Sequence, residues 1–262
     1  METKLYKFSG AGNDFVVIDG REGDVSSFRE VARIEALCKE FKTDGLMILG
    51  SGDAEVDFTM EFYNPDGSGG MMCGNGGRCI VAFADYLGIR PASGDVFLFR
   101  APDGLHTGEI LERPEDDLWE VRIKMIDVHG ITPMQGGLFL NTGTRHFVKF
   151  VDDVEQVDID TEGRALRWNE AFAPVGTNVN FVHVAPDGLH VRTFEKGVEG
   201  ETLACGTGLT ACALVAHHAG EPTATPGAYR LRARQDWLSV NFTPEADEKF
   251  TDVYLTGPAR LL

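Results

Sequence analysis

One pattern occurs twice in this chain, first as Cys73-Gly74-Asn75-Gly76-Gly77 and again as Cys205-Gly206-Thr207-Gly208-Leu209. Each copy follows a stretch with strand-like alternation and leads into an apolar stretch with helical spacing. Because the pattern occurs only twice and at long spacing, it indicates two related halves rather than a solenoid of short repeats. We therefore expect two domains that face each other and contribute one cysteine each.

Strand-like alternation dominates the rest of the chain, and turn sequences such as Asn64-Pro65-Asp66-Gly67 separate the strands. Helical spacing is clear only after the two glycine-rich copies and in Phe28–Phe41, where Val31, Ile34, Leu37 and Cys38 share one face. The sequence thus predicts a strand-rich α+β fold. The expected strands include residues 55–63, 120–125, 178–184, 189–194, 237–242 and 252–255.

The expected domain boundary lies near Asp127–Pro133, where Gly130 and Pro133 interrupt the strand pattern. We predict an N-terminal domain over residues 1–127, to which a strand at 252–262 returns, and a C-terminal domain over residues 128–251.

The charge balance excludes one class of partner. The 24 Lys and Arg residues face 41 Asp and Glu residues, which gives a formal net charge of −17. Such a surface repels phosphate backbones, so we do not expect a nucleic-acid partner. No apolar run reaches the roughly 20 residues of a membrane span, and Met1–Gly10 lacks the layout of a signal peptide. We expect a cytoplasmic protein without a membrane partner.

The cysteines divide into two groups. Their number, five, is odd, and neither a C-x-x-C pair nor a common zinc spacing is present, so we expect reduced thiols and no metal site. Cys38, Cys79 and Cys212 lie on apolar helical faces and are predicted to be core residues. Cys73 and Cys205 precede glycine-rich helix starts instead, where the helix dipole favours a thiolate.

Two such cysteines suggest one particular chemistry. A thiolate on one half could remove a proton from a carbon while a thiol on the other half delivers a proton to the opposite face. The N–H groups at the two helix starts could hold the carboxylate attached to that carbon. Inversion at the α-carbon of an amino acid requires this arrangement. If both thiols point at one substrate, oxidation should also join Cys73 to Cys205 in an inactive disulfide.

Further motifs make the chain resemble the diaminopimelate epimerases. The resemblance covers nearly the whole chain and rests on blocks that occur in the family's order. They are Gly10-Ala11-Gly12-Asn13-Asp14-Phe15, Asn64-Pro65-Asp66-Gly67-Ser68, Cys73 to Cys79, Gly176-Thr177-Asn178-Val179-Asn180-Phe181, Glu195-Lys196-Gly197, Glu201 to Gly208 and Leu255-Thr256-Gly257-Pro258-Ala259.

The resemblance implies a fold of two pseudo-symmetric domains, each a mixed or antiparallel sheet around a central helix, with an active-site cleft between them. It implies an isomerase that interconverts LL- and meso-diaminopimelate on the route to lysine and peptidoglycan, without pyridoxal phosphate or any other cofactor. Cys73 and Cys205 would be the acid–base pair, and the enzyme would be a homodimer. The implied substrate-binding residues are Asn13, Asn64, Gly74, Asn75, Asn178, Glu195, Lys196, Gly206 and Thr207.

The chain departs from the family pattern at two positions. Lys196 stands where the family usually has arginine, and a lysine binds carboxylate as a point charge rather than bidentately. Gly143-Thr144-Arg145-His146 replaces the usual Gly-Asn-Pro-His and loses an asparagine expected at the distal end of the substrate. We hypothesise that Thr144 or Arg145 compensates there. His146 could orient a neighbouring group or be purely structural.

Three alternatives remain open at this level. A proline-racemase-like enzyme of the same fold usually carries histidine where Asn75 stands, so Asn75 favours diaminopimelate. A thiol redox protein would cycle Cys73 and Cys205 through a disulfide and consume peroxide. A binding protein that has lost catalysis is disfavoured because both cysteines are present.

Overall fold

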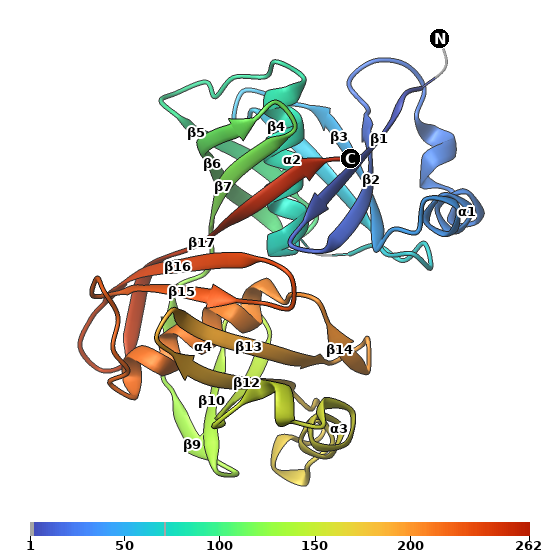
Figure 1. The fold of residues 1–262 in the computed structure, drawn as a ribbon. Coiled ribbons are helices and arrows are strands. Elements are labelled where there is room, and N and C mark those ends of the chain that lie inside the picture. The colour runs from blue at the N-terminus through green and yellow to red at the C-terminus, as the bar shows by residue number, and fades with distance from the viewer. Residues whose placement is uncertain (1–2, 71) are drawn as a thin grey trace. The chain divides into compact units, whose positions relative to one another are not determined.

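The structure is a computed structural model that describes residues 3–70 and 72–262. The chain divides into two compact units (Figure 1). Unit 1 comprises the described residues up to Ile123 together with Gly257–Leu262, and unit 2 comprises Lys124–Thr256. The predicted α+β class is confirmed, because each unit combines a mixed sheet with one long buried helix.

Unit 1 is a ring of hydrogen-bonded strands around one helix, α2 (Gly74–Tyr86). The ring runs in chain order from β1 to β7, and β17 closes it by pairing with both β7 and β1. The strands are β1 (Leu5–Gly10), β2 (Asn13–Asp19), β3 (Gly45–Ser51), β4 (Phe58–Tyr63), β5 (Val96–Ala101), β6 (Gly104–Glu115) and β7 (Leu118–Lys124). A 3-10 turn (Ser26–Arg29) and α1 (Val31–Phe41) connect β2 to β3.

Unit 2 repeats this plan around α4 (Gly206–His218). Its strands are β8 (Val128–His129), β9 (Thr132–Met134), β10 (Gly137–Asn141), β11 (Arg145–Phe150), β12 (Asn178–Ala185), β13 (Gly188–Glu195), β14 (Gly200–Thr202), β15 (Ala228–Arg232), β16 (Trp237–Pro244) and the first part of β17 (Lys249–Leu261). Four short helical segments connect β11 to β12: Val154–Gln156, Ile159–Gly163, α3 (Arg164–Arg167) and Glu170–Phe172.

The two units share one order of strand pairings. In unit 1, β1–β2 is antiparallel, β2–β3 parallel, β3–β4 antiparallel, β4–β5 parallel, and β5–β6–β7 antiparallel. The same sequence of directions recurs in unit 2 along β10, β11, β12, β13, β15, β16 and β17. The helix that follows each glycine-rich copy occupies the same place in both orders. It lies between β4 and β5 in unit 1 and between β13 and β15 in unit 2. The twofold echo in the sequence therefore corresponds to a structural repeat.

Most of each central helix is buried because nearly all of its side chains are small or apolar, and Asn75 and Arg78 are buried polar exceptions in α2. In α2 every residue from Gly74 to Ala84 is buried. A β-carbon on Gly10 of β1 would lie 2.8 Å from the Asn75 carbonyl oxygen and 2.9 Å from the Cys79 sulfur. Glycine at this position therefore allows the strand to approach the helix closely. Burial of Cys38, Cys79 and Cys212 confirms their assignment to the core.

One prediction about α1 was wrong. Ile34, Leu37 and Cys38 face the core as predicted, but Val31 is 53% exposed. The preceding residues 26–29 form a separate 3-10 turn, and Glu30 is extended, so the α-helix begins only at Val31. Val31 consequently occupies the first turn and lies beside the turn at Gly67 rather than under the sheet.

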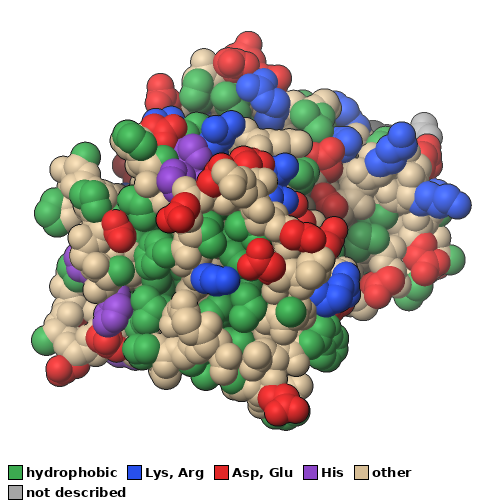
Figure 2. Space-filling view, turned by 60° about the horizontal axis from the view of Figure 1, so that its bottom comes forward, with side chains coloured by type: hydrophobic (Ala, Val, Ile, Leu, Met, Phe, Trp, Pro, Cys, Tyr) green, Lys and Arg blue, Asp and Glu red, His purple; other side chains and the backbone are tan. Residues whose placement is uncertain are grey.

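The surface carries both signs of charge. On the face that Figure 2 shows, apolar side chains gather in the middle, and acidic and basic side chains are scattered over and around them. Within the described residues, no helix combines the length and the apolar character that a membrane crossing requires.

Candidate active site

Cys73 caps the N-terminus of α2. Its backbone is extended (φ −101°, ψ 150°), and its sulfur accepts a hydrogen bond from the Gly76 N–H at 3.2 Å. The side chain is exposed. A β-carbon on Gly76 would lie 3.2 Å from this sulfur, so the glycine leaves room for the cap. Because an N–H donor and the helix dipole both favour negative charge, the position stabilises a thiolate.

Three of the predicted residues of unit 1 converge on this helix start. The Asn75 amide donates to the Asn13 side-chain oxygen at 2.5 Å. Arg78 is fully buried and donates to the Asn75 side-chain oxygen at 2.8 Å and to the Gly74 carbonyl at 3.2 Å. The sequence pattern gave no sign of this role for Arg78, because a charged residue in a helix is ordinarily expected at the surface. Its buried guanidinium fixes which way the Asn75 amide points.

Asn64 lies in the turn that follows β4. Its amide donates to the Ser68 hydroxyl at 3.0 Å, and its backbone N–H donates to the Ser68 carbonyl at 2.9 Å. The Ser68 hydroxyl in turn donates to Asp66. The structure therefore gives Asn64 a clear role in shaping this turn.

Cys205 precedes α4 and is 9% exposed. Its sulfur lies 3.5 Å from the Thr207 hydroxyl. It also makes a hydrogen bond with the Glu195 carboxyl group, which accepts a second one from Thr202 at 2.9 Å. Burial raises the pKa of Glu195, while the hydrogen bonds with Thr202 and Cys205 act in the opposite direction. A partly buried carboxyl group at this place is suited to exchange a proton with the thiol.

A polar cluster that the sequence did not reveal lies behind Thr207. The His146 Nε2 is 2.9 Å from the hydroxyl of Thr207 and 2.9 Å from that of Thr144. On its other side, Asn180 donates its amide to His146 Nδ1 at 3.1 Å. The orientation of Asn180 is fixed, because its oxygen accepts from Thr193 and its nitrogen also donates to the Phe147 carbonyl.

This arrangement determines the protonation state of His146. Because Nδ1 accepts a hydrogen bond, the single proton of the neutral ring is on Nε2, which donates toward the threonine hydroxyls. Burial lowers the pKa of His146 to about 3. The ring is therefore a neutral donor that orients Thr207 beside the Cys205 sulfur.

Asn178 joins the remaining predicted residues of unit 2. Its side-chain oxygen accepts from the Lys196 N–H at 2.8 Å, and its amide donates to the Arg145 carbonyl at 2.9 Å. The Arg145 guanidinium lies 5.1 Å from the centre of the Phe139 ring and donates to the Phe172 carbonyl at 3.3 Å. The Thr144 hydroxyl is directed to His146 and Thr207.

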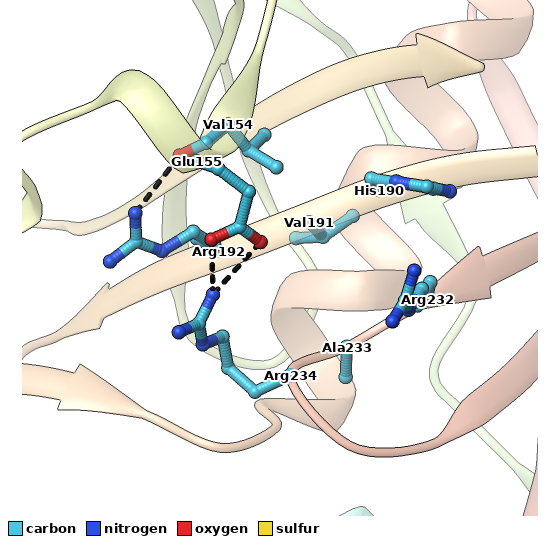
Figure 3. A pocket seen from close by; sticks show the side chains of 8 residues that line it. All are labelled: Val154, Glu155, His190, Val191, Arg192, Arg232, Ala233 and Arg234. Atoms are coloured by element: carbon cyan, nitrogen blue, oxygen red, sulfur yellow. Dashed lines mark hydrogen bonds and ion pairs between the residues drawn. The ribbon is translucent and has the colours of Figure 1, made fainter.

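A small pocket on unit 2 lies apart from these residues. Figure 3 shows the side chains that line it, and three of them are arginines. Arg234 contacts both oxygens of Glu155, and Arg192 forms a paired contact with Glu201 at 2.7 Å for each oxygen. Since the chain's own carboxylates pair with Arg192 and Arg234, we interpret these two ion pairs as structural: they anchor β14, which leads into Cys205.

Each unit thus presents a thiol at the start of a buried helix, next to N–H groups of the first turn. Each helix start can bind a carboxylate, and each thiol can transfer a proton. Unit 1 supplies the exposed thiol, and unit 2 supplies a buried one that is in contact with a carboxyl group and a hydroxyl.

The family model described as diaminopimelate epimerase matches residues 5–105 and 138–262. Among curated relatives, diaminopimelate epimerase of Flavobacterium psychrophilum is 38% identical over 99% of this chain and 98% of its own. The proteins of that name from Chlorobaculum tepidum and Aquifex aeolicus are 40% and 39% identical, over 96% and 97% of this chain and 96% and 94% of their own.

Solved structures share the fold at low sequence identity. A phenazine biosynthesis protein of the PhzF family from Bacillus anthracis superimposes with a TM-score of 0.77 at 10% identity, covering 100% of this chain and 98% of its own. A hydroxyproline epimerase from Agrobacterium vitis gives a TM-score of 0.68 at 16% identity, covering 100% and 91%.

Proposed function

Because this chain belongs to the diaminopimelate epimerase family of isomerases, we propose that it interconverts LL- and meso-diaminopimelate by passing protons between Cys73, Cys205 and one α-carbon. The observation that carries the proposal is the repeat of a cysteine at the start of a buried helix, at the same place in both units. The fold alone would not support this assignment, because the solved structures that share the fold include proteins described by other functions.

The proposed reaction balances without an external reagent. One thiolate takes the α-proton, and the electrons of the C–H bond move into the neighbouring carboxylate. The other thiol then gives its proton to the opposite face of the carbon, which leaves the two sulfurs with exchanged protonation states. Backbone N–H groups of Gly74, Asn75, Gly206 and Thr207 would stabilise the charge on the carboxylate.

The contacts of each thiol support complementary resting states. Cys73 accepts the Gly76 N–H, which favours its thiolate, whereas Cys205 faces the Glu195 carboxyl group. We propose that Cys73 rests as thiolate and Cys205 as thiol, and that Glu195 relays a proton when Cys205 acts as base. Thr207 would contribute a hydroxyl beside the Cys205 sulfur.

We further propose that the other predicted residues bind the remainder of the substrate, with Lys196 facing the distal carboxylate. Lys196 is exposed, and its ammonium group suits a carboxylate ligand. Asn13, Asn64 and Asn178 would lend amide groups. Of the two residues suggested as compensation for the missing asparagine, Thr144 is the better candidate, because its hydroxyl lies beside Thr207 and the Asn178 amide, whereas the Arg145 guanidinium contacts Phe139 and the Phe172 carbonyl.

The family resemblance also supports a homodimer that works in the cytoplasm. The odd number of cysteines and the reliance on two reduced thiols fit a reducing compartment. Sedimentation velocity of the purified protein tests the dimer directly: a single boundary at the monomer mass across the accessible concentrations would contradict it.

A deuterium-exchange experiment tests the main proposal. LL-diaminopimelate is incubated with the protein in deuterium oxide without added cofactor, while NMR and chiral analysis follow the α-positions. We expect meso product with deuterium at the inverted centre. Cys73→Ala and Cys205→Ala should abolish turnover, whereas Cys212→Ala, which removes a buried thiol of raised pKa, should retain it. Exchange with proline but not with diaminopimelate would overturn the substrate assignment.

A further inference from the structure

The hairpin loop between β13 and β14 carries Lys196 and is held by a buried arginine outside the site described above. β13 and β14 pair as far as Glu195 and Gly200, so the loop is Lys196-Gly197-Val198-Glu199. The Glu199 N–H donates to the Glu195 carbonyl at 2.8 Å and closes the loop. The Lys196 N–H donates to the side-chain oxygen of Asn178, which lies outside the loop.

The Glu199 side chain folds back over this loop. Its carboxylate accepts the Gly197 N–H at 3.1 Å and receives Nε and Nη2 of Arg167 at 3.2 and 3.0 Å. Glu199 adopts a left-handed backbone (φ 58°), a conformation that is strained for a residue with a side chain. The chain thus tolerates local strain at the residue that brings this carboxylate to the Gly197 N–H.

Arg167 connects the loop to a second segment of the site. It lies at the end of α3 and is 5% exposed, an uncommon burial for arginine. A β-carbon on Gly176 would lie 1.8 Å from its Nη1, so the guanidinium packs directly against the backbone two residues before Asn178. The Trp168 ring lies 4.2 Å from the guanidinium carbon. One guanidinium therefore supports both the Asn178 segment and the Lys196 loop.

We propose that Arg167 and Glu199 are positioning residues for substrate binding: acting through the Gly197 N–H, they hold the hairpin loop in the shape that presents Lys196 to the distal carboxylate. This inference rests on the proposed function for the identity of the ligand, although the loop geometry is independent of it. A lysine reaches a carboxylate through a long flexible stem, so a fixed backbone beneath it limits the conformations that binding must freeze.

Kinetics of three variants test the proposal. Glu199→Ala removes the acceptor for both Gly197 and Arg167. We expect KM for diaminopimelate to rise about tenfold, an effect of the size that a single charge-assisted hydrogen bond to the substrate contributes, with kcat within about twofold of wild type. Glu199→Gln retains an acceptor oxygen and should restore much of the loss. Glu162→Ala breaks the exposed contact with Lys149 in the same unit and serves as the control, with unchanged constants.

A double variant separates positioning from a general loss of stability. If Glu199 acts through Lys196, Lys196→Ala/Glu199→Ala should have the KM of Lys196→Ala alone, because the loop then has no ammonium left to present. Additive effects, or a fall in kcat at constant KM, would overturn the proposal. Should Glu199→Ala fail to fold, Arg167→Lys replaces it, since lysine keeps the charge but loses the two-nitrogen contact.

A measurement without substrate completes the test. Hydrogen exchange of peptides that cover residues 195–199 should become faster in Glu199→Ala and remain slow in Glu162→Ala, with other strands of unit 2 unchanged. Unchanged exchange in the loop would overturn the inference even in an active enzyme. Faster exchange in a protein that does not turn over diaminopimelate would support the role of Arg167 and Glu199 in holding the loop. It would refute the proposed function instead.

Discussion

His146 shows how burial decides the charge of a single residue. Its folded pKa is about 3, well below the value of 6.5 for an ordinary histidine. As the pH falls below 6.5, the unfolded chain takes up a proton that the folded ring does not. The stability that neutral His146 confers is therefore complete above pH 6.5 and is lost progressively toward pH 3.

Acid unfolding measures this effect. Between about pH 6.5 and pH 4.5 the free energy of unfolding of the wild type should fall more steeply than that of His146→Gln, by about 1.4 kcal/mol per pH unit. Urea titrations of both proteins across this range provide the slopes. Parallel slopes would mean that His146 titrates normally in the folded protein.

Cys73 is predicted to have a structural role besides its chemical one. Its sulfur caps α2 through the Gly76 N–H, and loss of a capping acceptor costs about 1 kcal/mol. Cys73→Ser should keep the stability of the wild type, while Cys73→Ala should lose that amount, and neither should turn over substrate. Thermal unfolding of the two inactive variants makes the comparison; equal stabilities would show that the cap contributes nothing.

At the scale of elements, close contacts at glycines hold the central helices in place. A β-carbon on Gly208 would lie 2.5 Å from the side-chain oxygen of Asn180, whose amide nitrogen donates to His146. Gly208→Ala should therefore push Asn180 out of position, destabilise unit 2 by about 1–3 kcal/mol and lower kcat. Gly200→Ala meets nothing within 4 Å and is the matched control. Equal melting temperatures for the two variants would contradict the crowding argument.

The sequence predicted elements better than it predicted contacts. The strands 178–184 and 189–194 appear as β12 and β13, because alternation is a local signal. Local patterns did not reveal that Arg78 and Arg167 are buried. Arg78 donates to Gly74 and Asn75 of its own helix and to the distant Pro258 carbonyl, and Arg167 pairs with Glu199, which lies 32 residues further along the chain. The register that brings His146 beside Asn178 links strands 32 residues apart.

The candidate site was predictable where the motif is short and continuous. Cys73 and Cys205 both begin helices as expected, and Asn75 lies where the motif implied. The connection from Cys205 through Thr207 to His146 and Asn180 could not be predicted, because it joins segments from three parts of the chain that meet only after the sheet has formed. Asparagine at position 180 looked like an ordinary strand residue.

For the whole molecule, the net charge of −17 predicts that the melting temperature depends on the salt concentration. Repulsion among acidic groups opposes the compact state and is screened as the Debye length falls from about 30 Å to about 8 Å between 0.01 M and 0.15 M salt. The melting temperature should rise over this interval, equally in NaCl and KCl. A flat or falling curve would show that the interspersed basic groups already cancel the repulsion.

The proposed pairing of the two cysteines makes a second prediction at this scale. Diamide should take two electrons and two protons from Cys73 and Cys205 and leave an intramolecular disulfide that inactivates the enzyme. Peptide mass spectrometry should identify the cross-link, and dithiothreitol should restore activity. Cys205→Ser must lack the cross-link. Full resistance of the wild type to diamide would argue against a shared substrate carbon.

The course of β17 through both units has a consequence for synthesis on the ribosome. The gap between β7 and β1 is filled by Gly257–Leu261, which is translated more than a hundred residues after β7 is complete. Until then the newly made first unit exposes two unpaired strand edges, the kind of surface on which nascent chains stick to one another. Loss of only these last residues to a premature stop codon should therefore yield insoluble protein, although both cysteines and both central helices would still be encoded.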